Sequence, residues 1–266
     1  MSIETTIEII LNIIQMIILI PIIIISAETI SKDKTGIVGA LFTFSMISVL
    51  LTDIYWIAYD MLRPDTHMPF SGEEIAGSAV ILLLASALSP LLPKGRKLSV
   101  RGIVLTFLFM AANIILWIAW SGEWAQDIIF GLPYVYLMLV LMKGIEHFEI
   151  FGKRECIFAV AICSVIIILH FSVLATEGEL QSGLDLINYL IMIATVMLFF
   201  IKNLRMMKDK RPGRAVCASF CLFFYSVIVL YMSSGYFYDI ATFFYTLTLP
   251  LMLINVKKEI TRSDLC

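Results

Sequence analysis

Six polar side chains lie inside long apolar stretches of the sequence, where a polar group needs a partner or a function. Two of them, Asp53 and His170, are ionisable. An ionisable group at the centre of a bilayer costs about 2.5–3.5 kcal/mol on insertion scales. The two residues are predicted to lie at similar depth in the membrane. An aspartate and a histidine placed in this way could form an acid–base pair or the polar base of a binding site. The four amides of the set are Asn12, Gln15, Asn113 and Asn188.

Further acidic and aromatic residues follow Asp53 toward the same end of its segment. Asp60 comes seven residues later, which places both carboxylates on one face of a helix, two turns apart, with Trp56 between them. If the apolar segments close into one bundle, we expect a net acidic, aromatic-rimmed cavity lined by the second, fourth and sixth helices. Asp53 should lie near its floor. The residues expected to bind a ligand there are Asp53, Asp60, Trp56, Asn113, Trp117, His170, Asn188 and Glu74.

Each of these residues also has a purely structural explanation. Tryptophan and tyrosine gather at the membrane–water interface in most membrane proteins. Asp53 could form a structural hydrogen bond with Asn113 or a neighbouring hydroxyl, and His170 could be a core histidine with its hydrogen bonds satisfied. The acidic face could be what remains after the basic residues are sorted to the other side.

The elements that must position these residues are membrane-spanning helices. Of 266 residues, 60% are hydrophobic and 15% are charged, which lies outside the range of soluble domains. The apolar blocks are about twenty residues long, enough to cross ~30 Å of hydrocarbon as a helix. We predict one all-α integral membrane domain over residues 1–266, with no soluble domain. The predicted spans are about 7–27, 36–59, 75–93, 102–120, 126–142, 156–174, 183–201, 215–233 and 238–255.

Basic residues fix the predicted orientation. All 19 lysines and arginines except Arg63 fall in the odd-numbered breaks between spans or in the C-terminal tail. By the positive-inside rule these segments are cytoplasmic, so the N-terminus is outside and the C-terminus inside. The basic run from Lys202 to Arg214 fits either a topology anchor or a site for an anionic lipid or partner, and we favour the anchor.

The eight helices after the first could be four degenerate helical hairpins. The second span ends in Trp56-Ile57-Ala58-Tyr59 and the fourth in Trp117-Ile118-Ala119-Trp120. Duplication explains this similarity, but so do the preferences of outer turns for glycine and serine and of helix starts for carboxylates.

Several function classes lack their required residues. No Gly-x-Ser-x-Gly nucleophile elbow, phosphate-binding loop or dinucleotide fingerprint occurs. Three histidines, with His147 on the opposite side from His67 and His170, do not suit a three-histidine zinc site. We expect no cofactor, no metal and no nucleic-acid partner.

Three functions remain for a multi-pass protein of the cytoplasmic (plasma) membrane, which we expect to be prokaryotic. The first is binding of a small or cationic extracellular ligand by a receptor, sensor or transport accessory, with a membrane or cytoplasmic signalling protein as partner. The second is an intramembrane lipid-processing enzyme that uses Asp53 and His170 as catalytic residues. The third is a structural subunit of a membrane assembly. Membrane lipids are partners in all three.

Overall fold

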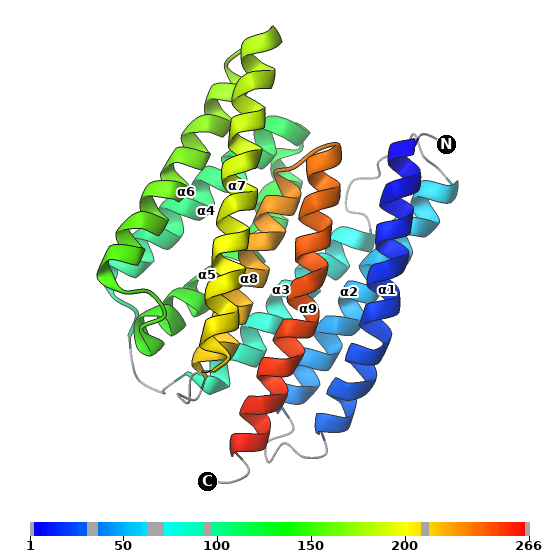
Figure 1. Cartoon of the computed structure of the whole chain (residues 1–266), viewed down its shortest axis with the longest axis vertical. Coiled ribbons are helices and arrows are strands. Elements are labelled where there is room, and N and C mark those ends of the chain that lie inside the picture. The colour runs from blue at the N-terminus through cyan, green and yellow to red at the C-terminus, as the bar shows by residue number, and fades with distance from the viewer. Residues whose placement is uncertain (1–2, 31–36, 63–71, 93–96, 209–212, 264–266) are drawn as a thin grey trace.

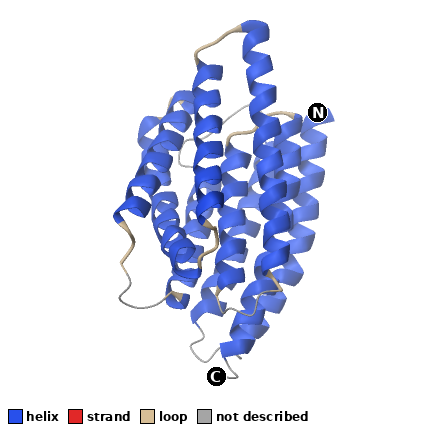
Figure 2. Cartoon of the chain, turned by 60° about the vertical axis from the view of Figure 1, so that its left-hand side comes forward, coloured by secondary structure: helices blue, strands red, loops and turns tan. Residues whose placement is uncertain are grey.

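Helices make up nearly all of the computed structural model, which describes residues 3–30, 37–62, 72–92, 97–208 and 213–263 (Figure 1). Within these ranges no residue forms a strand (Figure 2). The all-α prediction is therefore confirmed. The α-helices are α1 (Ile3–Ile30), α2 (Ile37–Leu62), α3 (Gly72–Leu88), α4 (Val100–Ser121), α5 (Trp124–Phe148), α6 (Lys153–Leu174), α7 (Gly178–Met206), α8 (Arg214–Tyr231) and α9 (Tyr236–Ser263).

The nine α-helices of the described residues are each long and apolar enough to cross a membrane. Every predicted span corresponds to one of them. Several helices continue beyond the predicted spans, as α7 does with 29 residues. The reason is that hydropathy marks only the apolar part of a helix, whereas the backbone continues until a residue ends it.

Local sequence explains where individual helices begin and end. The Ser99 hydroxyl accepts a hydrogen bond from the Gly102 N–H at the start of α4, which satisfies one of the open donors there. Gly122 ends the same helix with φ +75°, a left-handed conformation that suits glycine. The predicted span 75–93 is α-helical only to Leu88, because Pro90 lacks an N–H and the chain tightens into a 3-10 turn, η1 (Ser89–Leu91).

Consecutive helices run in opposite directions, with the N-terminus and the C-terminus at opposite ends of the bundle (Figure 1). Helix α8 is central: 72% of the residues in its apolar stretch are buried, compared with 17% for α6. Helix α1 packs against α2 and α9, whereas α6 packs against α7 and α4. The helices α1 and α6 therefore lie on opposite sides of the molecule (Figure 1).

The predicted hairpins α2/α3, α4/α5, α6/α7 and α8/α9 each consist of packed neighbours. Any up-and-down bundle would produce these contacts, so duplication stays a prediction. The antiparallel order also brings the basic residues together at the end that holds the C-terminus. The described members of this basic end are Lys97, Arg101, Lys143, Lys153, Arg154, Lys202, Arg205, Lys208, Arg214, Lys257 and Lys258.

Candidate functional site

A cavity of about 620 Å³ lies between α1, α2, α3, α4, α5, α8 and α9. Its lining includes the start of α3 and the turn between α4 and α5, so it lies at the end of the bundle that holds the N-terminus (Figure 1). The volume falls within the range of about 300–1,000 Å³ that is typical of small-molecule sites. We call this hollow the acidic cavity, for the carboxylates described below.

The deepest polar group of the acidic cavity joins three helices. The Gln15 amide of α1 donates to both carboxylate oxygens of Asp53 on α2, at 2.8 and 2.9 Å. The Thr246 hydroxyl of α9 donates to the Gln15 carbonyl oxygen at 2.6 Å. Asp53 is 5% exposed and Gln15 is 3% exposed. These bonds hold the Asp53 carboxylate in one position, as a preorganised binding site requires.

Buried apolar side chains lie beneath this polar group. One helical turn closer to the basic end, Gln15 is followed by Leu19, Asp53 is preceded by Val49, and Thr246 is followed by Leu249. All three of these apolar residues are buried, with 0–2% of their surface exposed.

Four more carboxylates line the cavity: Glu73, Glu74, Glu123 and Asp127. The Gln126 amide donates to Glu74, and the Ser121 hydroxyl donates to Asp127 at 2.5 Å. No lysine, arginine or histidine is among the described residues that line the cavity. The described lining thus contains five carboxylates and no basic residue, and such a set creates a negative potential that a low-dielectric wall strengthens.

Aromatic side chains form much of the wall. Trp117, Tyr134 and Tyr231 pack edge to face around one another, with ring centroids 5.5 Å apart for Trp117–Tyr134 and 6.2 Å apart for Tyr134–Tyr231. The Trp117 indole N–H is buried and has no hydrogen-bond partner among the described residues. The aromatic residues that line the cavity are Trp56, Trp117, Trp120, Phe130, Tyr134, Phe223, Tyr231, Tyr238 and Tyr245.

The structure brings four of the predicted ligand-binding residues together. Asp53, Trp56, Glu74 and Trp117 all line the acidic cavity. The side chain of Asp60 lies outside the described residues, and so do Arg63, Asp65 and His67.

The other predicted residues lie elsewhere. Asn113 and His170 line a separate hollow of about 20 Å³, together with Tyr225 of α8. The Asn113 amide donates to the Phe109 carbonyl at 2.8 Å, so it is not the partner of Asp53. Asn188 is fully buried and lines neither hollow, and its amide has no hydrogen-bond partner among the described residues.

The expected lining by the second, fourth and sixth helices was therefore wrong in part. Helices α2 and α4 line the acidic cavity, but α6 contributes no residue to it. The physical reason is the packing order: α6 contacts α7 and α4 at the side of the bundle opposite α1. Similar depth along the membrane normal does not make two residues neighbours.

Sequence reasoning missed the contribution of α9 and the tyrosines of α5 and α8. Tyr238, Thr242, Tyr245 and Thr246 follow one another at helical spacing within an apolar segment, and they carry polar groups along one face. That spacing is a signal that the sequence does contain. Tyr134 and Tyr231 have no such pattern around them, and only the fold identifies them.

No protein-family model matches this chain, and comparisons with curated proteins and with solved structures give no significant match. The chemistry of the acidic cavity itself therefore carries the functional proposal.

Proposed function

We propose that this protein binds a small organic cation in the acidic cavity and acts as a receptor-like or sensor-like membrane protein. The observation that carries the proposal is the composition of the wall: five carboxylates and nine aromatic side chains, with no basic residue among the described lining. Carboxylates attract a cation, and aromatic faces stabilise a desolvated cation by about 2 kcal/mol or more. The carboxylates would repel an anionic ligand, and a neutral ligand would lack the charge attraction to both the carboxylates and the aromatic faces.

An organic cation fits this wall better than a metal ion does. A metal ion needs several oxygen, nitrogen or sulfur ligands close together. The described histidines, cysteines and carboxylates form no group of three that could hold one. The carboxylates are instead spread from Asp53 at the base to Glu123 at the rim.

The apolar packing beneath Asp53 favours sensing over transport. A transporter needs a polar path to the other side, whereas Leu19, Val49 and Leu249, one turn beneath the Gln15–Asp53–Thr246 group, are apolar and buried. Ligand binding would then change the packing of α1, α2 and α9, which the Gln15–Asp53–Thr246 group joins. A separate membrane or cytoplasmic protein would receive that change. In a transport system the protein would serve as an accessory that captures the ligand.

No observation favours a lipid-processing enzyme. That function requires Asp53 and His170 within hydrogen-bond reach or one water apart. The two residues line different hollows.

We further propose that the protein resides in the cytoplasmic membrane of a prokaryotic cell, with the acidic cavity facing outward. The basic end of the bundle would face the cytoplasm by the positive-inside rule. The acidic cavity lies at the opposite end, where an extracellular ligand would reach it.

Labelling of single cysteines tests this orientation. In a background without native cysteines, we expect Ser121→Cys, Ser182→Cys and Ser234→Cys to react with an impermeant thiol reagent added to intact cells. All three serines are exposed and lie at the end that holds the cavity. Lys97→Cys, Lys153→Cys and Lys208→Cys should react only after the membrane is opened. Reaction of any of this second group in intact cells would refute the proposed orientation.

Cation binding is tested with a charged probe and its neutral isostere. Choline and 3,3-dimethylbutan-1-ol have almost the same shape, but only choline is charged. We expect choline to raise the melting temperature of the purified protein and the neutral alcohol to leave it unchanged, because a ligand of the folded state stabilises it by about 2.7 kcal/mol at a hundred times its Kd.

The salt dependence of this binding provides a second measurement. The association rate of choline should fall as ionic strength rises and the Debye length shrinks from ~30 Å to ~3 Å. Equal melting-temperature shifts with both compounds would contradict a cation site, and so would the absence of any shift with a series of larger alkylammonium ions.

A further inference from the structure

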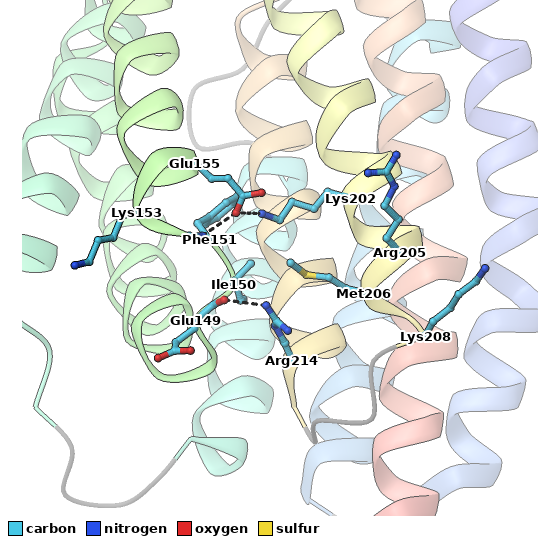
Figure 3. Close-up of a pocket in the computed structure, with 11 residues that line it drawn as sticks. Glu149, Ile150, Phe151, Lys153, Glu155, Lys202, Arg205, Met206, Lys208 and Arg214 are labelled. Carbon is cyan, nitrogen blue, oxygen red and sulfur yellow. Dashed lines mark hydrogen bonds and ion pairs between the residues drawn. The ribbon is translucent and has the colours of Figure 1, made fainter.

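A second large hollow lies at the basic end of the bundle. Its volume is about 840 Å³, and it is bounded by the turn between α5 and α6, the last turns of α7 and the start of α8 (Figure 3). We call it the basic pocket. It is separate from the acidic cavity, with which it shares no lining residue.

The basic pocket has an excess of positive charge. Its lining contains five basic residues and two glutamates, so 5 − 2 gives a formal charge of +3. Three of the basic side chains form no hydrogen bond or ion pair within the described structure. These are Lys153, Arg205 and Lys208.

The other two basic side chains are held in place from opposite sides of the pocket. Lys202 lies 2.6 Å from the Glu155 carboxylate and 4.4 Å from the centre of the Phe151 ring. Arg214 donates to the Glu149 carbonyl at 2.9 Å. Figure 3 shows both side chains extending into the space between α7 and the turn before α6. A guanidinium presents five N–H donors in a planar fork, a geometry that suits the oxygens of a phosphate.

The two glutamates offset only part of the positive charge of the pocket. Glu155 also accepts a hydrogen bond from the Gly152 N–H at 2.7 Å, which caps the start of α6. Its carboxylate is thus shared between Lys202 and the helix end. The Glu149 side chain points away from Lys202 and Arg214 in Figure 3.

The surroundings of the basic pocket suit a lipid better than a soluble anion. Ile150 and Met206 provide a buried apolar floor, with 1% and 8% of their surface exposed. Next to the pocket, apolar side chains of α6 and α7 are exposed along the spans, among them Ile157 (71%) and Leu198 (57%). A phosphate held by Lys202 and Arg214 would therefore have apolar helix surface beside it for acyl chains.

We propose that the basic pocket binds the headgroup of an anionic phospholipid from the leaflet at that end of the bundle. The phosphate lies between Lys202 and Arg214, Arg205 and Lys208 add charge at the α7 edge, and the acyl chains follow α6 and α7. The site is independent of the cation proposed for the acidic cavity. The basic run from Lys202 to Arg214, which is predicted to be a topology anchor, would thus also hold a lipid.

The test measures lipid binding to the purified protein by native mass spectrometry. Phosphatidylglycerol is the anionic probe, phosphatidylcholine the zwitterionic control and glycerol 3-phosphate the control without acyl chains. We expect phosphatidylglycerol to bind more tightly than both. The Arg205→Gln/Lys208→Gln variant should bind it roughly thirtyfold more weakly, because each basic side chain near an anionic lipid contributes about a fivefold change.

A matched pair of variants separates the pocket from charge in general. Lys97 and Lys257 are exposed at the same end but do not line the pocket. Lys97→Gln/Lys257→Gln removes the same charge and should change the affinity less than twofold. Arg205→Lys/Lys208→Arg keeps the charge and should retain binding, which shows that the positions tolerate substitution. The proposal is overturned if both neutralised pairs weaken binding equally, if phosphatidylcholine binds as tightly, or if glycerol 3-phosphate does.

Discussion

Replacing Asp53 with asparagine should weaken cation binding at least about tenfold and leave the protein folded. The substitution removes the negative charge at the base of the acidic cavity. Asparagine still offers an oxygen that can accept the hydrogen bond from Gln15, which now approaches the Asp53 carboxylate at 2.8 Å. A hydrogen bond to a charged group contributes about 1.5–3 kcal/mol, so we expect affinity for a cationic probe to fall at least about tenfold. The melting temperature without ligand should be unchanged or higher, because a buried charge is lost.

The control for Asp53→Asn is Asp185→Asn. Asp185 is half-buried on α7 at the same end of the bundle, and it does not line the acidic cavity. The Asp185→Asn substitution changes the overall charge by the same amount as Asp53→Asn. It therefore reports any long-range electrostatic effect on association of the cationic probe. We expect Asp185→Asn to bind the probe with nearly wild-type affinity. If Asp53→Asn instead lowers the melting temperature and keeps the affinity, the carboxylate serves only as a structural hydrogen-bond acceptor.

The membrane architecture could be predicted because it depends on local properties of the sequence. Apolar length and the placement of lysine and arginine identified nine spans, and nine helices of suitable length and composition occupy the described residues. Hydropathy does not detect a position where a single residue changes the backbone conformation. Pro90 turns the end of α3 into a 3-10 turn inside a segment that hydropathy treats as uniform.

The site was harder to predict because it depends on which helices are neighbours. The sequence predicted Asn113 and His170 at a depth similar to that of Asp53, whereas the fold pairs Asp53 with Gln15 across 38 residues. Hydropathy does not determine the order of helices around a bundle or the face that each turns inward. His170 was therefore grouped with Asp53, although α6 lies at the other side.

Burial of polar side chains at the basic end of the bundle could not be predicted from the sequence either. The half of the bundle at the basic end contains two buried amides, Asn203 of α7 and Asn255 of α9. Asn203 lies two residues beyond the predicted span 183–201, and Asn255 is the last residue of the predicted span 238–255. At these positions the sequence does not tell an interfacial side chain from a buried one. Neither amide has a hydrogen-bond partner among the described residues. Buried polar groups without partners cost free energy, so these residues are sites where an internal water would be stabilising.

Helix α5 approaches α8 closely at Gly144, toward the basic end of the bundle. A Cβ at Gly144 would lie 2.4 Å from the Cys217 sulfur of α8. Cys217 is fully buried, so the sulfur has little room to move. Ten residues before Gly144 on α5, Tyr134 packs against Tyr231 of α8, with ring centroids 6.2 Å apart.

We therefore expect Gly144→Ala to destabilise the protein by about 1–3 kcal/mol, the usual effect of overpacking a core. Gly183→Ala is the matched control, because a Cβ at Gly183 has no atom within 4 Å and alanine favours a helix by about 0.5–1 kcal/mol over glycine. Thermal unfolding in detergent should show a lower melting temperature for the first variant and an equal or higher one for the second. Adding Cys217→Ala to Gly144→Ala should restore most of the loss, since the next atoms, of Leu92 and of the residue 217 Cβ, lie 3.5 and 3.6 Å away. A double variant no more stable than Gly144→Ala alone would show that Cys217 does not set the distance between α5 and α8.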